Sequence, residues 1–189
     1  MSHIIDNFDA RLGAKIEAER ARRDWSLRDL ADRAGVSRAM ISKIERGEVS
    51  ATAALLGRLA AALDLSLSQL MLMTETGADR VSRAADQAVW RDPDTGYTRR
   101  QRSPARSGSR LEIAEIELPA GKAVDFPASS YAFLDHQILV LEGRLDFTRD
   151  GEVFALGVGD CLHIGGAADC EYRNATEESC RYLVVLTRV

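Results

Sequence analysis

The sequence is poor in the residues that mark secreted, membrane-spanning and fibrous proteins. Its 189 residues include only three cysteines, none before Cys161, so we predict no disulfide framework and a reducing, cytoplasmic environment. The longest apolar runs, such as residues 183–186, fall far below the roughly 20 residues that a membrane-spanning helix needs. The N-terminal segment lacks the basic and apolar regions of a signal peptide. No glycine-based repeat indicates a fibre.

What is present fits two small folded domains. With 46 % hydrophobic and 29 % charged residues, the chain can bury real cores, and its length suits two domains better than one. The net charge of −4 hides an asymmetry, because residues 1–73 carry +1 and residues 74–189 carry −5. Within residues 33–46, four basic side chains face only one acid, Glu45. The local charge therefore permits DNA binding without requiring it.

The first part of the chain has a helical pattern, from residue 7 to about residue 73, with no proline. A first amphipathic helix is predicted to run to about Arg23. Serine or threonine caps then predict further helices that start after Ser26, Ser37 and Thr52, and a short turn over residues 67–72 closes the bundle. Gly35 and Gly47 end the second and third helices, since glycine favours the left-handed cap.

Residues 74–87 are small and polar, which predicts a flexible linker. From residue 88 the pattern changes to the alternation of β-strands, clearest over residues 111–118, and Asp150-Gly151 indicates a hairpin turn. Many short strands with no helical window predict an antiparallel sandwich or barrel. The predicted fold is α+β in two domains, an all-α bundle over 1–73 and an antiparallel β-barrel over 88–189.

The most specific motif lies in residues 27–46, LRDLADRAGVSRAMISKIER. Two helices that touch across a tight turn need a small residue at the contact, here Ala31. Four residues later the turn needs positive φ, which Gly35 provides. The buried faces require apolar residues, and these positions hold Leu30, Val36, Ile41 and Ile44. An ordinary helical hairpin is the alternative. Over residues 7–73 the chain resembles the phage-repressor and Cro-like (XRE-type) helix-turn-helix domain.

That resemblance implies that the third helix enters the major groove of DNA. Arg38 is the predicted base reader, because a guanidinium matches the two acceptors on a guanine edge. The other predicted contacts are with bases or the backbone: Arg28, Ser37, Ala39, Ser42, Lys43 and Arg46. Plain solubilising charge is the alternative for each arginine and lysine. The resemblance also pairs Arg20 with Glu45, unless the two form only a weak surface pair.

Residues 110–188 resemble a cupin, a double-stranded β-helix, through LVLEG at 139–143 and GDCLHIGGAADCEYRN at 159–174. Catalytic cupins hold a metal with three histidines and a glutamate. Here His136 stands at the glutamate position and Cys170 at the last histidine position, while residues 129–132 offer no strong ligand. His136 and Cys170 remain candidates for a barrel ligand site, with a soft metal only if His163 or Cys161 also turns inward. We predict no metal and no cofactor, with His136 and Cys170 as buried, inert side chains.

An arginine run at positions 99, 100, 102, 106 and 110 is interpreted as a solvated strand and loop, with contact to the DNA backbone as the alternative.

Together these features predict a sequence-specific, DNA-binding transcriptional regulator and not an enzyme. Its partners are duplex DNA, a second copy of the chain and a small-molecule effector of the barrel, and no membrane. A cupin metalloenzyme with a helical assembly domain is the main alternative. A DNA-binding scaffold whose barrel only dimerises is the third.

Overall fold

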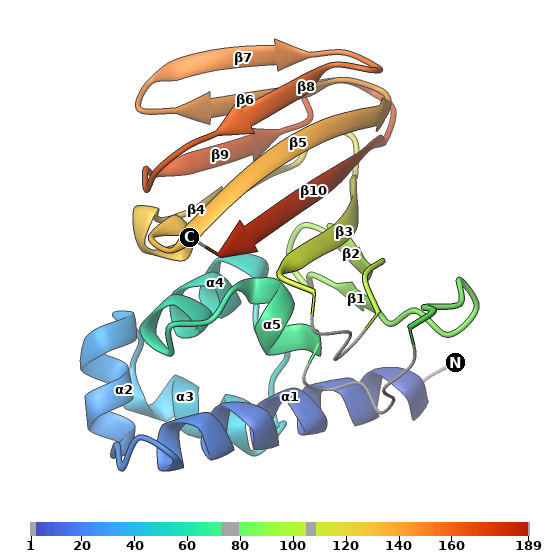
Figure 1. Ribbon diagram of the computed structural model, residues 1–189. Coiled ribbons are helices and arrows are strands. Elements are labelled where there is room, and N and C mark those ends of the chain that lie inside the picture. Colours follow the sequence, from blue (N-terminus) through green and yellow to red (C-terminus); the bar gives the residue numbers. More distant parts are fainter. Residues whose placement is uncertain (1–2, 73–79, 105–108, 189) are drawn as a thin grey trace.

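The computed structural model describes residues 3–72, 80–104 and 109–188 (Figure 1). Five helices form one end of the molecule, and two β-sheets are stacked above them. The helices are α1 (His3–Ala21), α2 (Leu27–Ala34), α3 (Arg38–Glu45), α4 (Ala53–Ala62) and α5 (Leu67–Leu72). None of the described helices is long and apolar enough to span a membrane.

Local capping signals set the helix boundaries, as the sequence predicts. Ser26 and Asp29 form a reciprocal capping box at the start of α2, and Gly35 ends that helix at φ 62°. The side chains of Ser37 and Thr52 accept hydrogen bonds from backbone N–H groups at the starts of α3 and α4. The first helix begins at His3, earlier than its apolar pattern indicates, and ends two residues before Arg23.

The helices pack around one apolar centre. Its fully buried members come from α1 to α4 and include Leu12, Ile16, Leu30, Ile41, Ile44, Leu56 and Leu59. The contact between α1 and α3 is close because α1 carries a glycine at position 13. A Cβ atom on Gly13 would lie 2.7 Å from the carbonyl oxygen of Glu45. This glycine therefore sets how α3 lies on α1.

All described strand pairs are antiparallel, as the sequence predicts. One sheet has six strands in the order β1-β2-β3-β10-β5-β8, and the other has four in the order β4-β9-β6-β7. The strands are β1 (Val89–Arg91), β2 (Thr98–Gln101), β3 (Leu111–Leu118), β4 (Ala123–Phe126), β5 (Leu134–Glu142), β6 (Leu145–Arg149), β7 (Glu152–Leu156), β8 (Cys161–Ile164), β9 (Cys170–Arg173) and β10 (Cys180–Arg188), with a 3-10 turn η1 (Ala128–Tyr131).

The predicted hairpin turn lies between β6 and β7, where Asp150 and Gly151 both have positive φ, 50° and 83°. Aromatic rings fill the space between the two sheets. Phe147 and Tyr172 make an edge contact at 4.9 Å, and Tyr172 stacks on Tyr182 at 5.9 Å. Among the described strands, no backbone pairing joins one sheet to the other. The antiparallel sheet prediction is confirmed, and closure into a barrel stays a prediction.

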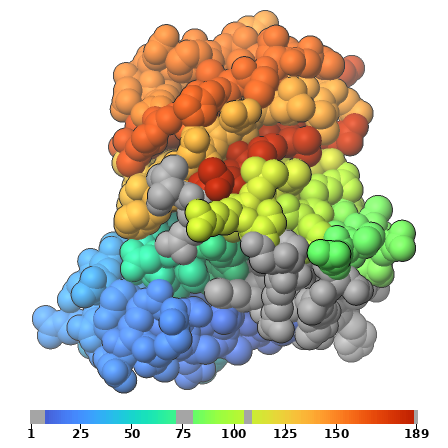
Figure 2. Space-filling model, viewed as in Figure 1, coloured from blue at the N-terminus to red at the C-terminus, as the bar shows by residue number. Residues whose placement is uncertain are grey.

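The helical part and the sheets are in direct contact (Figures 1 and 2). The backbone N–H of Ala53, at the start of α4, donates to the Asp92 carboxylate at 2.6 Å. The hydroxyl of Ser66 donates to Glu112 on β3 at 2.9 Å. Along the chain between Ala53 and Ser66, α4 packs against β4 and η1. Residues 74–79 of the predicted linker lie outside the described residues, and residues 80–87 form no helix or strand.

Candidate functional site

The turn between α2 and α3 gathers several predicted DNA contacts on one surface. A groove there is lined by Ser26, Leu27, Arg28, Ser37, Arg38 and Ala39. The side chain of Ser37 accepts from the backbone N–H of Met40, so its hydroxyl caps α3 while remaining exposed. Further along α3, Lys43 is exposed and Ser42 is half-buried.

The basic side chains on this surface differ in their partners. Arg38 and Lys43 have no acidic group within 4.0 Å among the described residues. Arg28 lies 3.7 Å from Asp32, but both side chains are more than 70 % exposed. Such an exposed pair contributes little free energy, so a stronger anion displaces it readily.

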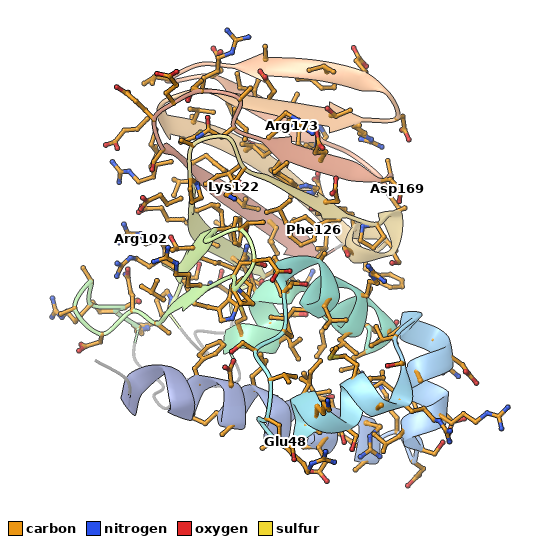
Figure 3. All side chains as sticks on the ribbon, turned by 180° about the vertical axis from the view of Figure 1, so that it is seen from behind. Glu48, Arg102, Lys122, Phe126, Asp169 and Arg173 are labelled. Atoms are coloured by element: carbon orange, nitrogen blue, oxygen red, sulfur yellow. The ribbon has the colours of Figure 1, made fainter. Side chains whose placement is uncertain are left out.

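Arg46, at the end of α3, is held by an acidic partner that the helical pattern does not predict. Its guanidinium donates to both carboxylate oxygens of Glu48, at 2.5 and 2.9 Å, and to the Ser42 hydroxyl. The Glu48 hydrogen bond raises the pKa of Arg46. Figure 3 places Glu48 on the outer side of the helical part, beside α3. A phosphate at Arg46 therefore competes with Glu48 for the guanidinium.

An ion pair fixes α3 against the first helix. The guanidinium of Arg20 donates to both oxygens of Glu45, at 2.7 and 2.8 Å, and also to the carbonyl of Trp25 at 2.9 Å. The Arg20 and Glu45 side chains are 15 % and 7 % exposed, so this is not the weak surface pair. The hydrogen bond that Arg20 donates to Glu45 raises the pKa of Arg20. The pairing that the resemblance implies is confirmed.

Within the sheets, His136 is buried among aromatic rings. Its side chain is 2 % exposed and stacks on Tyr131 at 4.6 Å, with only 10° between the ring planes. Neither ring nitrogen has a hydrogen-bond partner among the described residues. Burial lowers the pKa of His136 to about 4, so the ring is neutral near pH 7.

The other candidate ligands do not complete a metal site with His136 among the described residues. Cys170 is buried, its thiol donates to the Ala168 carbonyl at 3.2 Å, and burial raises its pKa to about 11. His163 and Cys161 share the exposed face of β8, with His163 bonded to Asp135 at 2.6 Å. Among the described residues, no three His, Cys, Asp or Glu side chains form a group that could hold a metal ion. These residues do not fit the metal of a catalytic cupin.

The arginine run is not a uniformly solvated segment. Arg99 is only 6 % exposed, and Arg102 bonds to Glu115 at 2.5 Å (Figure 3). The solvated interpretation is therefore wrong for Arg99, while Arg106 lies outside the described residues. Strand alternation places Arg99 on the same face as Tyr97 and Gln101, but only the structure shows that this face is buried.

Comparisons with known proteins match both parts of the chain. Residues 16–70 match the helix-turn-helix family HTH_3, and residues 134–186 match the cupin domain family Cupin_2. The HTH-type transcriptional regulator SutR of Escherichia coli (strain K12) is 26 % identical over 178 residues, which cover 94 % of this chain and 95 % of SutR.

A solved structure with a high TM-score shares the fold. The HTH_3 family transcriptional regulator from Vibrio cholerae is similar over 97 % of this chain and 98 % of that one, with a TM-score of 0.78 and 24 % identity. Hydroxypropylphosphonic acid epoxidase from S. wedmorenis covers 95 % and 98 % at 15 % identity, but its TM-score of 0.48 is too low to support any assignment. The two domain matches and the relative that aligns over nearly its whole length identify the chain as a DNA-binding transcriptional regulator of the XRE type with a C-terminal cupin domain.

Proposed function

We propose that the protein recognises a specific duplex DNA site by placing α3 in the major groove. The observation that carries this proposal is a pair of exposed cations on α3, Arg38 and Lys43, neither of which has an acidic group within 4.0 Å among the described residues. Arg38, in the first turn, is the base reader, while Lys43 meets the phosphate backbone. Arg28 and the free N–H groups at the start of α2 suit a second phosphate. Ser37, Ala39 and Ser42 lie beside the same bases. Arg46 contacts the DNA backbone when a phosphate replaces Glu48 as its partner.

The proposal includes two further roles for the rest of the chain. Two copies bind half-sites about 34 Å apart, as paired helix-turn-helix domains do. The sheets of residues 88–189 close as a cupin barrel that joins the copies, responds to a small molecule, or does both. The barrel is not catalytic, because His136 and Cys170 have no third ligand beside them among the described residues. The protein acts in the cytoplasm, where bacterial DNA is found, and residues 1–73, 74–87 and 88–189 are its DNA-binding domain, linker and barrel domain.

The direct test of this function is the salt dependence of binding to a pool of genomic DNA fragments. If about six phosphates are neutralised, a log–log plot of affinity against salt concentration has a slope near −5. Selected fragments should share one sequence and should outcompete random duplex of equal length. Failure to retain any fragment, even at the lowest salt concentration, would refute DNA binding.

Single substitutions should separate base reading from backbone contact. We expect Arg38→Ala to weaken binding to the best site by about 1–3 kcal/mol and to relax preference at one base pair. Lys43→Ala should weaken all sites about equally and reduce the salt slope by about one. Arg58→Ala, which removes one exposed positive charge from α4, is the matched control and should leave sequence preference unchanged. An unchanged preferred sequence in Arg38→Ala contradicts the assignment of the base reader.

A further inference from the structure

A cavity lies where the helical part meets the sheets. It has a volume of about 40 Å³ and receives side chains from both parts of the chain. Gly57 of α4 and Leu67 of α5 line one side, and residues of β2, β4, η1, β5, β9 and β10 line the other. Figure 3 places Phe126, one of these residues, just above the helices. The cavity therefore adjoins both the DNA-binding domain and the cupin domain.

The cavity wall contains a buried cation without a counter-anion. The Arg99 side chain donates through Nη2 to the Ser68 hydroxyl, but its Nε has no acceptor among the described residues. No described carboxylate lies within 4.0 Å of its guanidinium. Removing a charge from water without pairing it is strongly unfavourable, so an anion bound beside Arg99 would offset that cost.

A second polar atom on the same wall also lacks a partner. The hydroxyl of Ser130 is buried and has no hydrogen-bond partner among the described residues. The Tyr131 and Tyr172 hydroxyls that line the cavity bond to each other at 3.2 Å. Arg99 also lines a neighbouring cavity, but at about 10 Å³ that space barely holds one water.

The rest of the lining is apolar or aromatic, with Leu67, Phe126, Leu134, Val184 and Leu186 as its aliphatic and phenyl members. A guanidinium and a hydroxyl set in an apolar wall match a carboxylate that carries a short hydrocarbon chain. A dianion would bring more negative charge than one arginine neutralises. The chemistry of the wall thus selects a small monocarboxylate.

We propose that this cavity is an effector site for a small aliphatic monocarboxylate, whose carboxylate accepts hydrogen bonds from Arg99 and Ser130. This inference rests on the proposed regulatory function and specifies where and how an effector would act. The site is separate from His136 and Cys170, neither of which lines the cavity.

The size of the cavity links its occupancy to the position of the DNA-binding domain. Ligand pockets usually measure about 300–1,000 Å³, so 40 Å³ admits only a few heavy atoms before the walls move. Gly57 allows the α4 backbone to approach closely, because a Cβ atom there would lie 2.9 Å from Phe126 and 3.0 Å from Ser130. A bound carboxylate with a hydrocarbon chain therefore pushes α4 and α5 away from the sheets. That movement reorients α3 in each copy and changes the affinity for paired half-sites.

The experiment titrates the full-length protein with acetate, propionate and butyrate at constant ionic strength, beside the corresponding neutral amides. Calorimetry and thermal unfolding report binding. We expect the carboxylates to bind and raise Tm, with the amides at least tenfold weaker. Arg99→Met should weaken carboxylate binding at least tenfold, and Ser130→Ala should weaken it to a smaller extent. Arg100→Met is the control, since the adjacent Arg100 points to the opposite face of β2 and should bind as the wild type does.

The stability of Arg99→Met distinguishes a ligand site from a structural arginine. Because the guanidinium has no counter-anion, its replacement by methionine should leave the Tm without ligand unchanged or higher, while the carboxylate-induced rise disappears. If Arg99→Met does not fold, Ser130→Ala and the comparison with amides show whether the cavity binds carboxylates. Equal binding of amides and carboxylates, or unchanged binding by Ser130→Ala and Arg99→Met, overturns the proposal.

A DNA-binding measurement separates this inference from the function on which it rests. Wild type and Arg99→Met should bind the selected DNA equally without carboxylate, and only the wild type should change its affinity when carboxylate is added. Intact DNA binding without any response to carboxylates overturns the effector site alone. Absence of DNA binding under every condition instead overturns the proposed function.

Discussion

Gly13→Ala is expected to destabilise the helical part by about 3 kcal/mol, although alanine is the better helix former. A Cβ atom at position 13 would meet the carbonyl oxygens of Ile44 and Glu45, the latter at 2.7 Å. Both oxygens belong to the backbone of α3, so no side chain can rotate to make room. The substitution must move α3 away from α1, and with it the DNA-binding surface.

The sign of the change in unfolding free energy tests this interpretation. In a helix with open space beside Gly13, alanine would stabilise the fold by about 1 kcal/mol. Ala14→Gly, at the exposed position next to it, is the matched control and should destabilise by about that amount through propensity alone. Urea unfolding measures both. A Gly13→Ala variant as stable as the wild type would show that α1 and α3 do not touch at this residue.

The sequence predicts the helical part well because its boundaries depend on local chemistry. Capping residues such as Ser26 and Thr52, and the left-handed Gly35, act within four residues of the helix ends that they define. The pairing of Arg20 with Glu45 is different, since 25 residues separate them. Only the resemblance to repressor domains predicted that contact, and burial of the pair could be seen only in the structure.

Predictions for the sheets succeed where they depend on alternation and fail where they depend on contacts between distant segments. Strand parity places His163 and Cys161 on one face, and the structure has both exposed. The burial of Arg99 depends on Ser68 of α5, 31 residues earlier in the chain. An arginine in a run of arginines is normally solvated, and nothing within the run shows that a helix from the other part covers it.

At the candidate DNA-binding site, too, the local pattern predicts exposure but does not predict contacts beyond the helix. Exposure of Arg38 and Lys43 follows from helical periodicity once Ile41 and Ile44 are known to be buried. The bond between Arg46 and Glu48 depends instead on the backbone conformation after α3, where Gly47 adopts φ 67° and turns the chain back. Periodicity ends with the helix, so the helical pattern does not predict that Glu48 lies beside Arg46.

The Asp92 carboxylate is one of the groups that join the two parts of the protein, and its loss should have a large effect. Asp92 is 3 % exposed and lies in the turn after β1. One oxygen accepts three hydrogen bonds within that turn, from the backbone N–H groups of Asp94 and Thr95 and from the Thr95 hydroxyl. The other oxygen accepts from the N–H of Ala53, which has no partner within α4 because it lies in the first turn.

We expect Asp92→Ala to destabilise the protein by roughly 3–5 kcal/mol, because buried donors in both parts lose their acceptor at once. Asp92→Asn should be milder, at about 1–3 kcal/mol. The three donors of the turn hold its remaining oxygen in place, so the new amide N–H₂ group faces the Ala53 N–H. The negative charge at the start of α4 is lost as well. Asn therefore preserves the turn and weakens only the contact between the helical part and the sheets.

Hydrogen exchange and thermal unfolding test whether Asp92→Asn preserves the turn and weakens only the contact between the helical part and the sheets. In the wild type, amides at the start of α4 should exchange only when the helices leave the sheets, and the protein should unfold in one transition. In Asp92→Asn those amides should exchange faster, and the helical part should melt before the sheets, while amides of β1 and β2 keep their protection. Asp94→Asn removes the same charge from an exposed position in the same turn and should change neither measurement. If Asp92→Asn matches Asp94→Asn in both measurements, the bond to Ala53 does not hold the two parts together.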